Sequence, residues 1–88
     1  EILLRKAQAL KQQGNWDDAI LYYNEILEKH GDDIHGDDAL FQLATIYEYN
    51  KIDLEKAKTY YFKLMKEYPG SLFVTEARKK YRSLQESI

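Results

Sequence analysis

The side chains best suited to chemistry gather in one short stretch, which holds both histidines and several aspartates. Imidazole nitrogens and carboxylate oxygens are ligands for divalent metal ions. The spacing, however, matches neither a zinc-binding pair on one helix face nor the calcium loop of an EF-hand. We therefore expect no metal site and interpret the aspartates as loop and capping residues, with a metal-regulated loop as the alternative. The residues are His30, Asp32, Asp33, His35, Asp37 and Asp38.

The remaining polar residues give no pattern typical of an enzyme. The chain has no cysteine, and its serines are Ser71, Ser83 and Ser87. None of them forms a recognisable serine, histidine and acid arrangement. The adjacent carboxylates Asp17 and Asp18 suit the first turn of a helix, where the helix dipole favours negative charge. The sequence also lacks a glycine-rich phosphate loop, so it predicts a non-catalytic chain without a cofactor.

Charge and hydropathy argue against nucleic-acid binding and against insertion into a membrane. The basic residues Arg78, Lys79, Lys80 and Arg82 lie close together, but no aromatic stacking residues are interleaved with them. A net charge of −2 gives the chain no general attraction to phosphate. No apolar run approaches the roughly 18 residues that a membrane span needs. We interpret the basic stretch as the solvated face of a helix.

The elements that position these residues are predicted to be helices. The chain has one proline and four glycines, and its apolar residues recur at helical spacing. Asn15 and Asp53 are suited to cap the second and fourth helices, and Asp37 or Asp38 to cap the third; Ser71 follows Pro69 and Gly70 and suits the fifth. The first, second and fourth predicted helices cover residues 1–13, 16–30 and 54–68; the third begins after Asp37 or Asp38 and ends at the turn 49–53, and the fifth begins after Ser71.

Two of these helices belong to an internal repeat. The stretch from Gly14 to His30 recurs from Ile52 to Tyr68, so that Ala19 corresponds to Ala57 and Tyr23 to Tyr61. A repeat of this length is typical of helical solenoids, in which stacked hairpins bury a continuous core. We expect the tyrosines to lie inward and the alanines Ala7, Ala19, Ala44 and Ala57 to lie where helices approach most closely.

These residues resemble a pair of tetratricopeptide repeats. The first carries Leu3, Ala7, Leu10, Gly14, Ala19, Tyr23 and Ile26, and the second Leu40, Leu43, Ala44, Tyr47, Ala57, Tyr61, Leu64 and Pro69. The sequence departs from the family pattern at Lys6, at Gly31, and at Lys51 or Ile52. The resemblance implies an all-α, right-handed solenoid segment: one domain, residues 1–88, with repeats 1–35 and 36–69 and a capping helix 70–88.

The last helix is expected to close the solenoid. Phe73, Ala77, Tyr81, Leu84 and Ile88 follow one side of it and charged residues the others, and Arg82 takes the place of Ala44. This pattern predicts the C-terminal end of a longer array. The linker Tyr68-Pro69-Gly70-Ser71 is similar to one in tetratricopeptide proteins of bacterial cell envelopes. That resemblance favours the envelope over the cytoplasm, although the sequence leaves the compartment unknown.

The resemblance also implies where a partner would bind. Partners of tetratricopeptide repeats lie along the surface lined by the first helix of each hairpin. Carried over by position, that groove consists of Leu4, Gln8, Lys11, Gln12, Phe41, Thr45, Glu48, Tyr49, Lys79 and Ser83. Phe41 and Tyr49 are candidate anchors, or alternatively they shield neighbouring helices. The lysine and asparagine pattern that clamps a chaperone's C-terminal carboxylates is absent.

These observations predict a protein-interaction module that binds a protein or peptide. The alternative is a structural spacer or oligomerisation segment with an empty groove. The apolar edge Ile2-Leu3-Leu4 has no preceding hairpin in this sequence. We expect it to pack on an upstream repeat or on a second copy of the chain, which would make a homo-oligomer.

Overall fold

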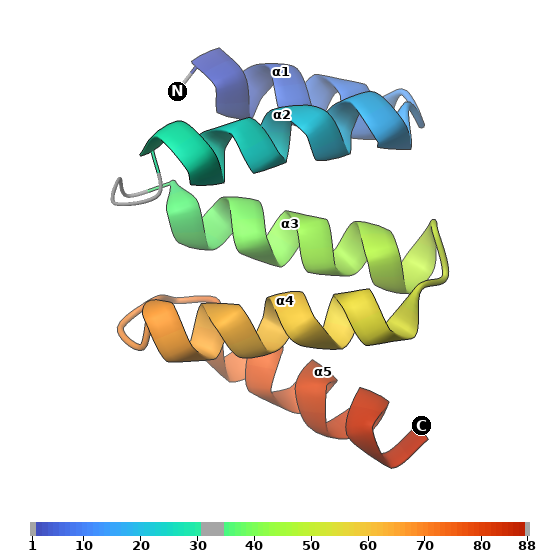
Figure 1. Cartoon of the computed structure of the whole chain (residues 1–88), viewed down its shortest axis with the longest axis vertical. Helices are drawn as coiled ribbons and strands as arrows, with labels where there is room; N and C mark the ends of the chain where they lie inside the picture. Colours follow the sequence, from blue (N-terminus) through green and yellow to red (C-terminus); the bar gives the residue numbers. More distant parts are fainter. Residues whose placement is uncertain (1, 31–34, 88) are drawn as a thin grey trace.

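Five α-helices run back and forth along a single stack in the computed structural model (Figure 1). The structure describes residues 2–30 and 35–87, and within these ranges it contains no strand. The helices follow one another in chain order, and the two ends of the chain lie at opposite ends of the stack (Figure 1). The all-α prediction is confirmed. The helices are α1 (Ile2–Gln12), α2 (Trp16–His30), α3 (Gly36–Tyr49), α4 (Leu54–Glu67) and α5 (Val74–Ser87).

The turn that joins α1 to α2 is made by glycine and asparagine, as the sequence predicts. Gly14 has a φ of 79°, in the left-handed region that closes many helices. The side chain of Asn15 then accepts a hydrogen bond from the backbone N–H of Asp18 at 3.4 Å. This bond satisfies one of the donors that the first turn of a helix leaves unpaired.

The equivalent turn between α3 and α4 has the same backbone shape but no glycine. Ile52 takes the position of Gly14 and has a φ of 52°, a conformation that a β-branched residue adopts only with strain. Asp53 caps α4 by accepting a hydrogen bond from the N–H of Lys56 at 3.2 Å, which confirms the predicted cap. The second hairpin therefore closes at a higher local cost than the first.

Two predicted helix starts are wrong. α3 begins at Gly36 after His35, and Asp37 and Asp38 lie inside its first turn instead of capping it. α5 begins at Val74, because Ser71 belongs to the preceding turn, where its Oγ accepts a hydrogen bond from the N–H of Phe73 at 3.0 Å. The same Oγ donates to Asp37. Asp37 and Ser71 thus join the start of α3 to the turn before α5.

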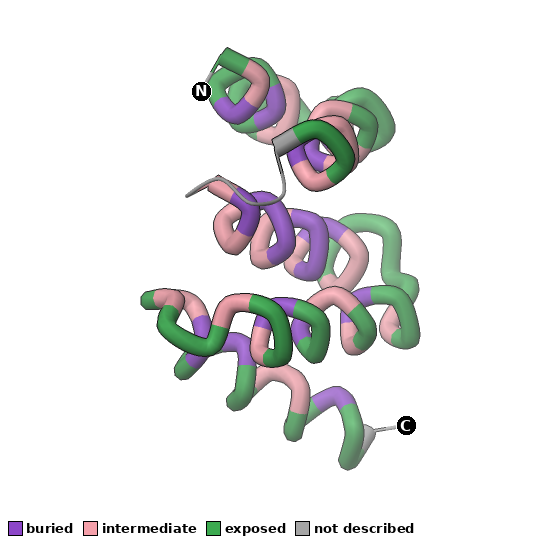
Figure 2. Tube along the Cα trace, turned by 60° about the vertical axis from the view of Figure 1, so that its left-hand side comes forward, coloured by how far each residue is buried: buried purple, intermediate pink, exposed green. Residues whose placement is uncertain are grey.

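The core forms two apolar clusters, and α3 contributes buried residues to both. Buried positions recur along α3 in the middle of the stack (Figure 2). One cluster joins α1, α2 and α3 around Tyr23, and the other joins α3, α4 and α5 around Tyr61. Both tyrosines are completely buried, as their register predicts. The four alanines expected at close helix contacts, Ala7, Ala19, Ala44 and Ala57, are also 0% exposed. No helix within the described ranges has the length and apolar character required to cross a membrane.

Candidate functional site

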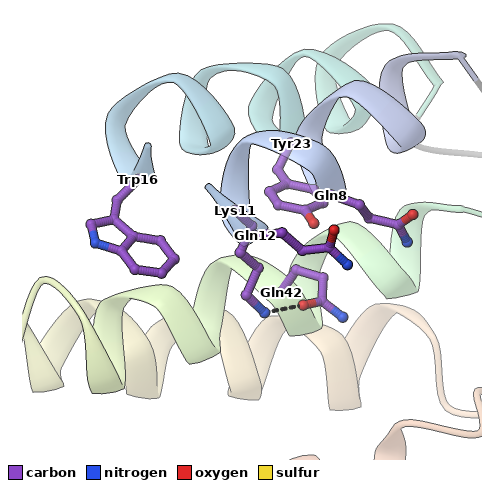
Figure 3. A pocket seen from close by; sticks show the side chains of 6 residues that line it. All are labelled: Gln8, Lys11, Gln12, Trp16, Tyr23 and Gln42. Carbon is purple, nitrogen blue, oxygen red and sulfur yellow. Dashed lines mark hydrogen bonds between the residues drawn. The ribbon is translucent and has the colours of Figure 1, made fainter. Parts of the chain in front are cut away.

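An open groove of about 490 Å³ lies where α1 and α2 meet α3 (Figure 3). Three residues of the predicted binding surface, Gln8, Lys11 and Gln12, line it together. They share one face of α1 because residues three and four positions apart are neighbours on a helix. The remaining lining residues are Trp16, Tyr23 and Gln42. A groove of this volume is within the range of ligand sites in proteins.

Lys11 crosses the groove from α1 to α3. Its Nζ donates hydrogen bonds to Oε1 of Gln42 and, at 3.3 Å, to Oγ1 of Thr45. Burial lowers the pKa of Lys11, while the nearby Asp38 carboxylate acts in the opposite direction. The cation is therefore partly desolvated, and its two hydrogen-bond partners are neutral oxygens.

Gln42 connects Lys11, which lines the groove, to Asp38, which does not. Its Oε1 accepts from Lys11 (Figure 3). Its Nε2 donates to Oδ1 of Asp38 at 3.2 Å. Thr45 donates to the backbone carbonyl of Gln42 at 2.9 Å. A Lys–Gln–Asp chain of hydrogen bonds thus runs from the groove to the first turn of α3. It links α1 to α3, while the side chains of Gln8 and Gln12 remain exposed at the groove.

Tyr23 brings an unpaired hydroxyl to the same groove. The residue is 0% exposed, and no described residue forms a hydrogen bond with its hydroxyl. Burial, with the Asp38 charge as a smaller cause, raises the pKa of Tyr23 well above its ordinary value. The hydroxyl therefore stays protonated at neutral pH and remains able to donate. An unpaired buried hydroxyl costs about 1–3 kcal/mol, so this group is a sign of an absent acceptor.

The tyrosine at the equivalent position of the second repeat has a buried hydroxyl with a hydrogen-bond partner. Tyr61 is also 0% exposed, but its hydroxyl donates to Oε1 of Glu48 at 2.8 Å. Lys80 Nζ lies 4.0 Å from the same carboxylate and also donates to the hydroxyl of Tyr49. Glu48 and Tyr49 belong to the predicted binding surface, but here they complete a network that joins α3, α4 and α5.

Phe41, one of the two candidate anchors, is half-buried and packs against neighbouring aromatic rings. Its ring stacks on Phe73 with centroids 4.8 Å apart and meets Tyr61 edge-on at 6.0 Å. Tyr49 is 57% exposed, with Lys80 Nζ 4.9 Å from its ring centroid. Of the two candidate anchors, Tyr49 is the more exposed.

Three other predicted residues lie apart from the groove. Leu4 is a correction: it is 7% exposed and belongs to the core around Tyr23, which it shares with buried residues of α2 and α3. Lys79 and Ser83 are exposed on α5 and do not line the cavity. Sequence reasoning missed Trp16 and Gln42 as lining residues. The position of Gln42, one helical turn from both Asp38 and Thr45, is the signal that would have identified it.

The histidine and aspartate stretch falls partly outside the described residues. Asp32 and Asp33 lie in the segment 31–34, and of His30 only the backbone is described. Asp37 accepts from Ser71 and from the N–H of Asp38, and Asp38 accepts from Gln42. Within residues 2–30 and 35–87 no group of three or more histidine or acidic side chains is placed to hold a metal ion.

Comparison with models of known protein families shows what the chain is related to. Two models described as tetratricopeptide repeat match the chain, one over residues 1–36 and the other over residues 38–71. The chain belongs to the tetratricopeptide repeat family. Tetratricopeptide repeats generally mediate contacts between proteins, bind proteins or peptides, and are generally non-catalytic. Comparison with curated proteins gave no match, and comparison with solved structures gave none.

Proposed function

We propose that this chain is a non-catalytic interaction module that holds an extended segment of a partner protein in the groove between α1 and α3. In this proposal residues 1–88 act as one domain, with repeats 1–35 and 36–69 and a capping helix 70–88. Membership of the tetratricopeptide repeat family supports protein or peptide as the class of ligand. The groove lined by Lys11 and Tyr23 supports the α1–α3 boundary as the place where this ligand binds.

The buried hydroxyl of Tyr23 is the observation that carries the proposal. It is a donor without an acceptor, at the base of a groove whose rim carries the exposed amides of Gln8 and Gln12. Carboxamides offer both donors and acceptors, as does a peptide main chain. A segment laid along α1 can therefore pair its amides with the glutamines, and a shift of the side chains that cover Tyr23 would let one carbonyl oxygen accept from its hydroxyl. Binding would then recover the cost that the free protein carries at this hydroxyl.

The last helix supports a C-terminal position within a longer array of repeats. The outer side of α5 is charged and exposed, and Arg82 lies where a further hairpin would require a small residue. The Tyr68-Pro69-Gly70-Ser71 linker supports a bacterial, envelope-located parent. Ser71 of this linker also has a structural role, because its Oγ donates to Asp37 and accepts from the N–H of Phe73.

Selection from a displayed library of random-sequence peptides tests the binding role. The selected peptides should bind the unmodified chain and lose about tenfold or more in affinity when Gln8 and Gln12 are both replaced by alanine. The matched control replaces Gln13 and Gln85, which are exposed glutamines outside the groove. Peptides that bind all three proteins equally would refute the groove. A library that yields no binder would favour a structural spacer.

A further inference from the structure

The contact between α3, α4 and α5 contains a carboxylate that lies between two hydrogen-bond donors. Glu48 accepts from the buried hydroxyl of Tyr61 at 2.8 Å, and the same carboxylate oxygen lies 4.0 Å from Lys80 Nζ. Hydrogen bonds to an ionised acceptor are stronger than those between neutral groups. One anion thus satisfies the hydroxyl and balances the charge of the lysine.

A lysine occupies the position of this glutamate in the first hairpin. Lys11 lies four residues after the buried Ala7 of α1, as Glu48 lies four residues after the buried Ala44 of α3. Lys11 lines the α1–α3 groove together with Tyr23. An ammonium group cannot accept a hydrogen bond. The exchange of glutamate for lysine therefore explains why the Tyr23 hydroxyl has no partner among the described residues.

The position of the partner lysine is also changed. Gln42 lies three residues after the buried Ala39 of α3, as Lys80 lies three residues after the buried Ala77 of α5. The amide of Gln42 is neutral and accepts from Lys11. The first hairpin thus presents a hydroxyl and an ammonium group, which are the same two kinds of donor that meet at Glu48, without a carboxylate of its own at the equivalent position.

The ammonium group of Lys11 is able to bind an anion from outside the chain. It has three donors, and the structure shows acceptors for two of them, in Gln42 and Thr45. Burial lowers the pKa of Lys11, which indicates that these neutral oxygens do not fully replace the water it has lost. Asp38 acts in the opposite direction on this pKa, but its carboxylate accepts from Gln42 and does not line the groove. The charge of the groove lining therefore favours a negative ligand group.

We propose that the partner segment carries an acidic side chain, glutamate or aspartate, which enters the α1–α3 groove and binds the ammonium group of Lys11. This inference rests on the proposed function and names the side chain that its ligand requires. One carboxylate oxygen accepts from Lys11. The other takes the place of a main-chain carbonyl as the acceptor for Tyr23, once the side chains that cover this hydroxyl shift. The complex then brings together hydroxyl, carboxylate and ammonium, the three groups that the second hairpin joins at Glu48.

The groove favours a side chain over the C-terminal carboxylate of a peptide. Its lining continues on both sides of Lys11, with Gln8 towards one end and Trp16 towards the other (Figure 3). A segment that contacts both ends passes Lys11 at its middle. The acidic group is therefore internal to the segment, and an apolar side chain of the partner suits the indole of Trp16.

Peptides selected from a displayed random-sequence library test this proposal on the 88-residue chain. Groove ligands are those that lose affinity when Gln8 and Gln12 are replaced by alanine. We expect these ligands to share an acidic residue at one position. Synthetic copies in which that residue is exchanged for its amide, glutamate for glutamine, should bind about tenfold or more weakly by calorimetry. Amidation of the peptide's C-terminus should leave the affinity unchanged.

Protein variants identify the group that the acidic residue contacts. On Lys11→Gln the same exchange in the peptide should have little effect, whereas Lys11→Arg should keep the preference for the acid because it keeps the charge. The matched control is Lys63→Gln, which removes an exposed lysine of α4 outside the groove and should leave the tenfold loss unchanged. Thermal melting of each variant shows that it is folded.

The outcomes separate this inference from the proposed function. Groove ligands without an acidic preference would overturn the inference and leave the proposed function in place. The same holds for ligands whose loss on the exchange is as large with Lys11→Gln as with the unmodified chain, and for ligands that bind only with a free C-terminal carboxylate. A library without any ligand that depends on Gln8 and Gln12 would refute the proposed function, and this inference with it.

Discussion

The two central tyrosines should respond in opposite directions to the loss of one oxygen atom. Tyr23 and Tyr61 are repeat equivalents with identical burial, so replacing either with phenylalanine removes a hydroxyl from the same kind of site. The hydroxyl of Tyr61 donates to Glu48, whereas that of Tyr23 has no described partner. Tyr23→Phe should therefore stabilise the free protein, and Tyr61→Phe should destabilise it.

The expected magnitudes follow from the state of each hydroxyl. A hydrogen bond to a charged group contributes about 1.5–3 kcal/mol, and Glu48 retains only 15% of its side-chain exposure, so Tyr61→Phe should cost about 1–3 kcal/mol. Removal of an unsatisfied buried hydroxyl recovers part of a desolvation cost of the same order, which sets the gain for Tyr23→Phe at about 1 kcal/mol. For a domain of this size, each kcal/mol corresponds to about 4–8 °C in melting temperature.

Urea unfolding, followed by circular dichroism, measures both differences in the unfolding free energy. Unchanged slopes against urea concentration would show that the changes lie in stability and not in the compactness of the unfolded chain. The reasoning on the groove is refuted if Tyr23→Phe destabilises the protein as much as Tyr61→Phe does. That result would mean that the Tyr23 hydroxyl already has a partner and is not held ready for a ligand. Binding of a selected peptide should weaken in Tyr23→Phe even as the protein becomes more stable.

Three further predictions concern the fold. Ile52→Gly should raise the unfolding free energy by about 1 kcal/mol in urea titrations, because it removes the strain of a positive φ; an unchanged or lower value would show that the turn is unstrained. Ala44→Leu should overpack the contact between α3 and its neighbours and cost about 1–3 kcal/mol by thermal melting, and full retention of stability would contradict the close packing. Stability should fall as pH rises above about 10, because burial raises the pKa of Tyr23, Tyr60 and Tyr61, and the unfolded chain loses those protons first. Absorbance of tyrosinate recorded alongside circular dichroism checks this, and complete ionisation before any unfolding would contradict it.

The internal repeat made most of the fold predictable from the sequence. Equivalent positions of a repeat occupy equivalent environments, so one match between Tyr23 and Tyr61 placed both tyrosines in the core. The caps at Asn15 and Asp53 were predictable because each depends on one local hydrogen bond. The starts of α3 and α5 were not, because Asp37 and Ser71 bind each other across the chain.

The groove was predictable only in part. Gln8, Lys11 and Gln12 follow from helical spacing on α1, which is a local property. The environments of Phe41 and Leu4 depend instead on distant segments that pack on them, which for Phe41 include Phe73 in the turn before α5, and no local sequence pattern reveals those contacts. The unpaired state of the Tyr23 hydroxyl also escaped prediction, because it depends on the absence of a Glu48 equivalent near it.

Nuclear magnetic resonance of the isotope-labelled chain tests the central claim most directly, because the side-chain amides of its glutamines report separate sites. On titration with a selected peptide, the side-chain signals of Gln8, Gln12 and Gln42 should move, while those of Gln13 and Gln85 should stay in place. Binding that moves Gln85 and leaves the three groove glutamines unchanged would contradict the account.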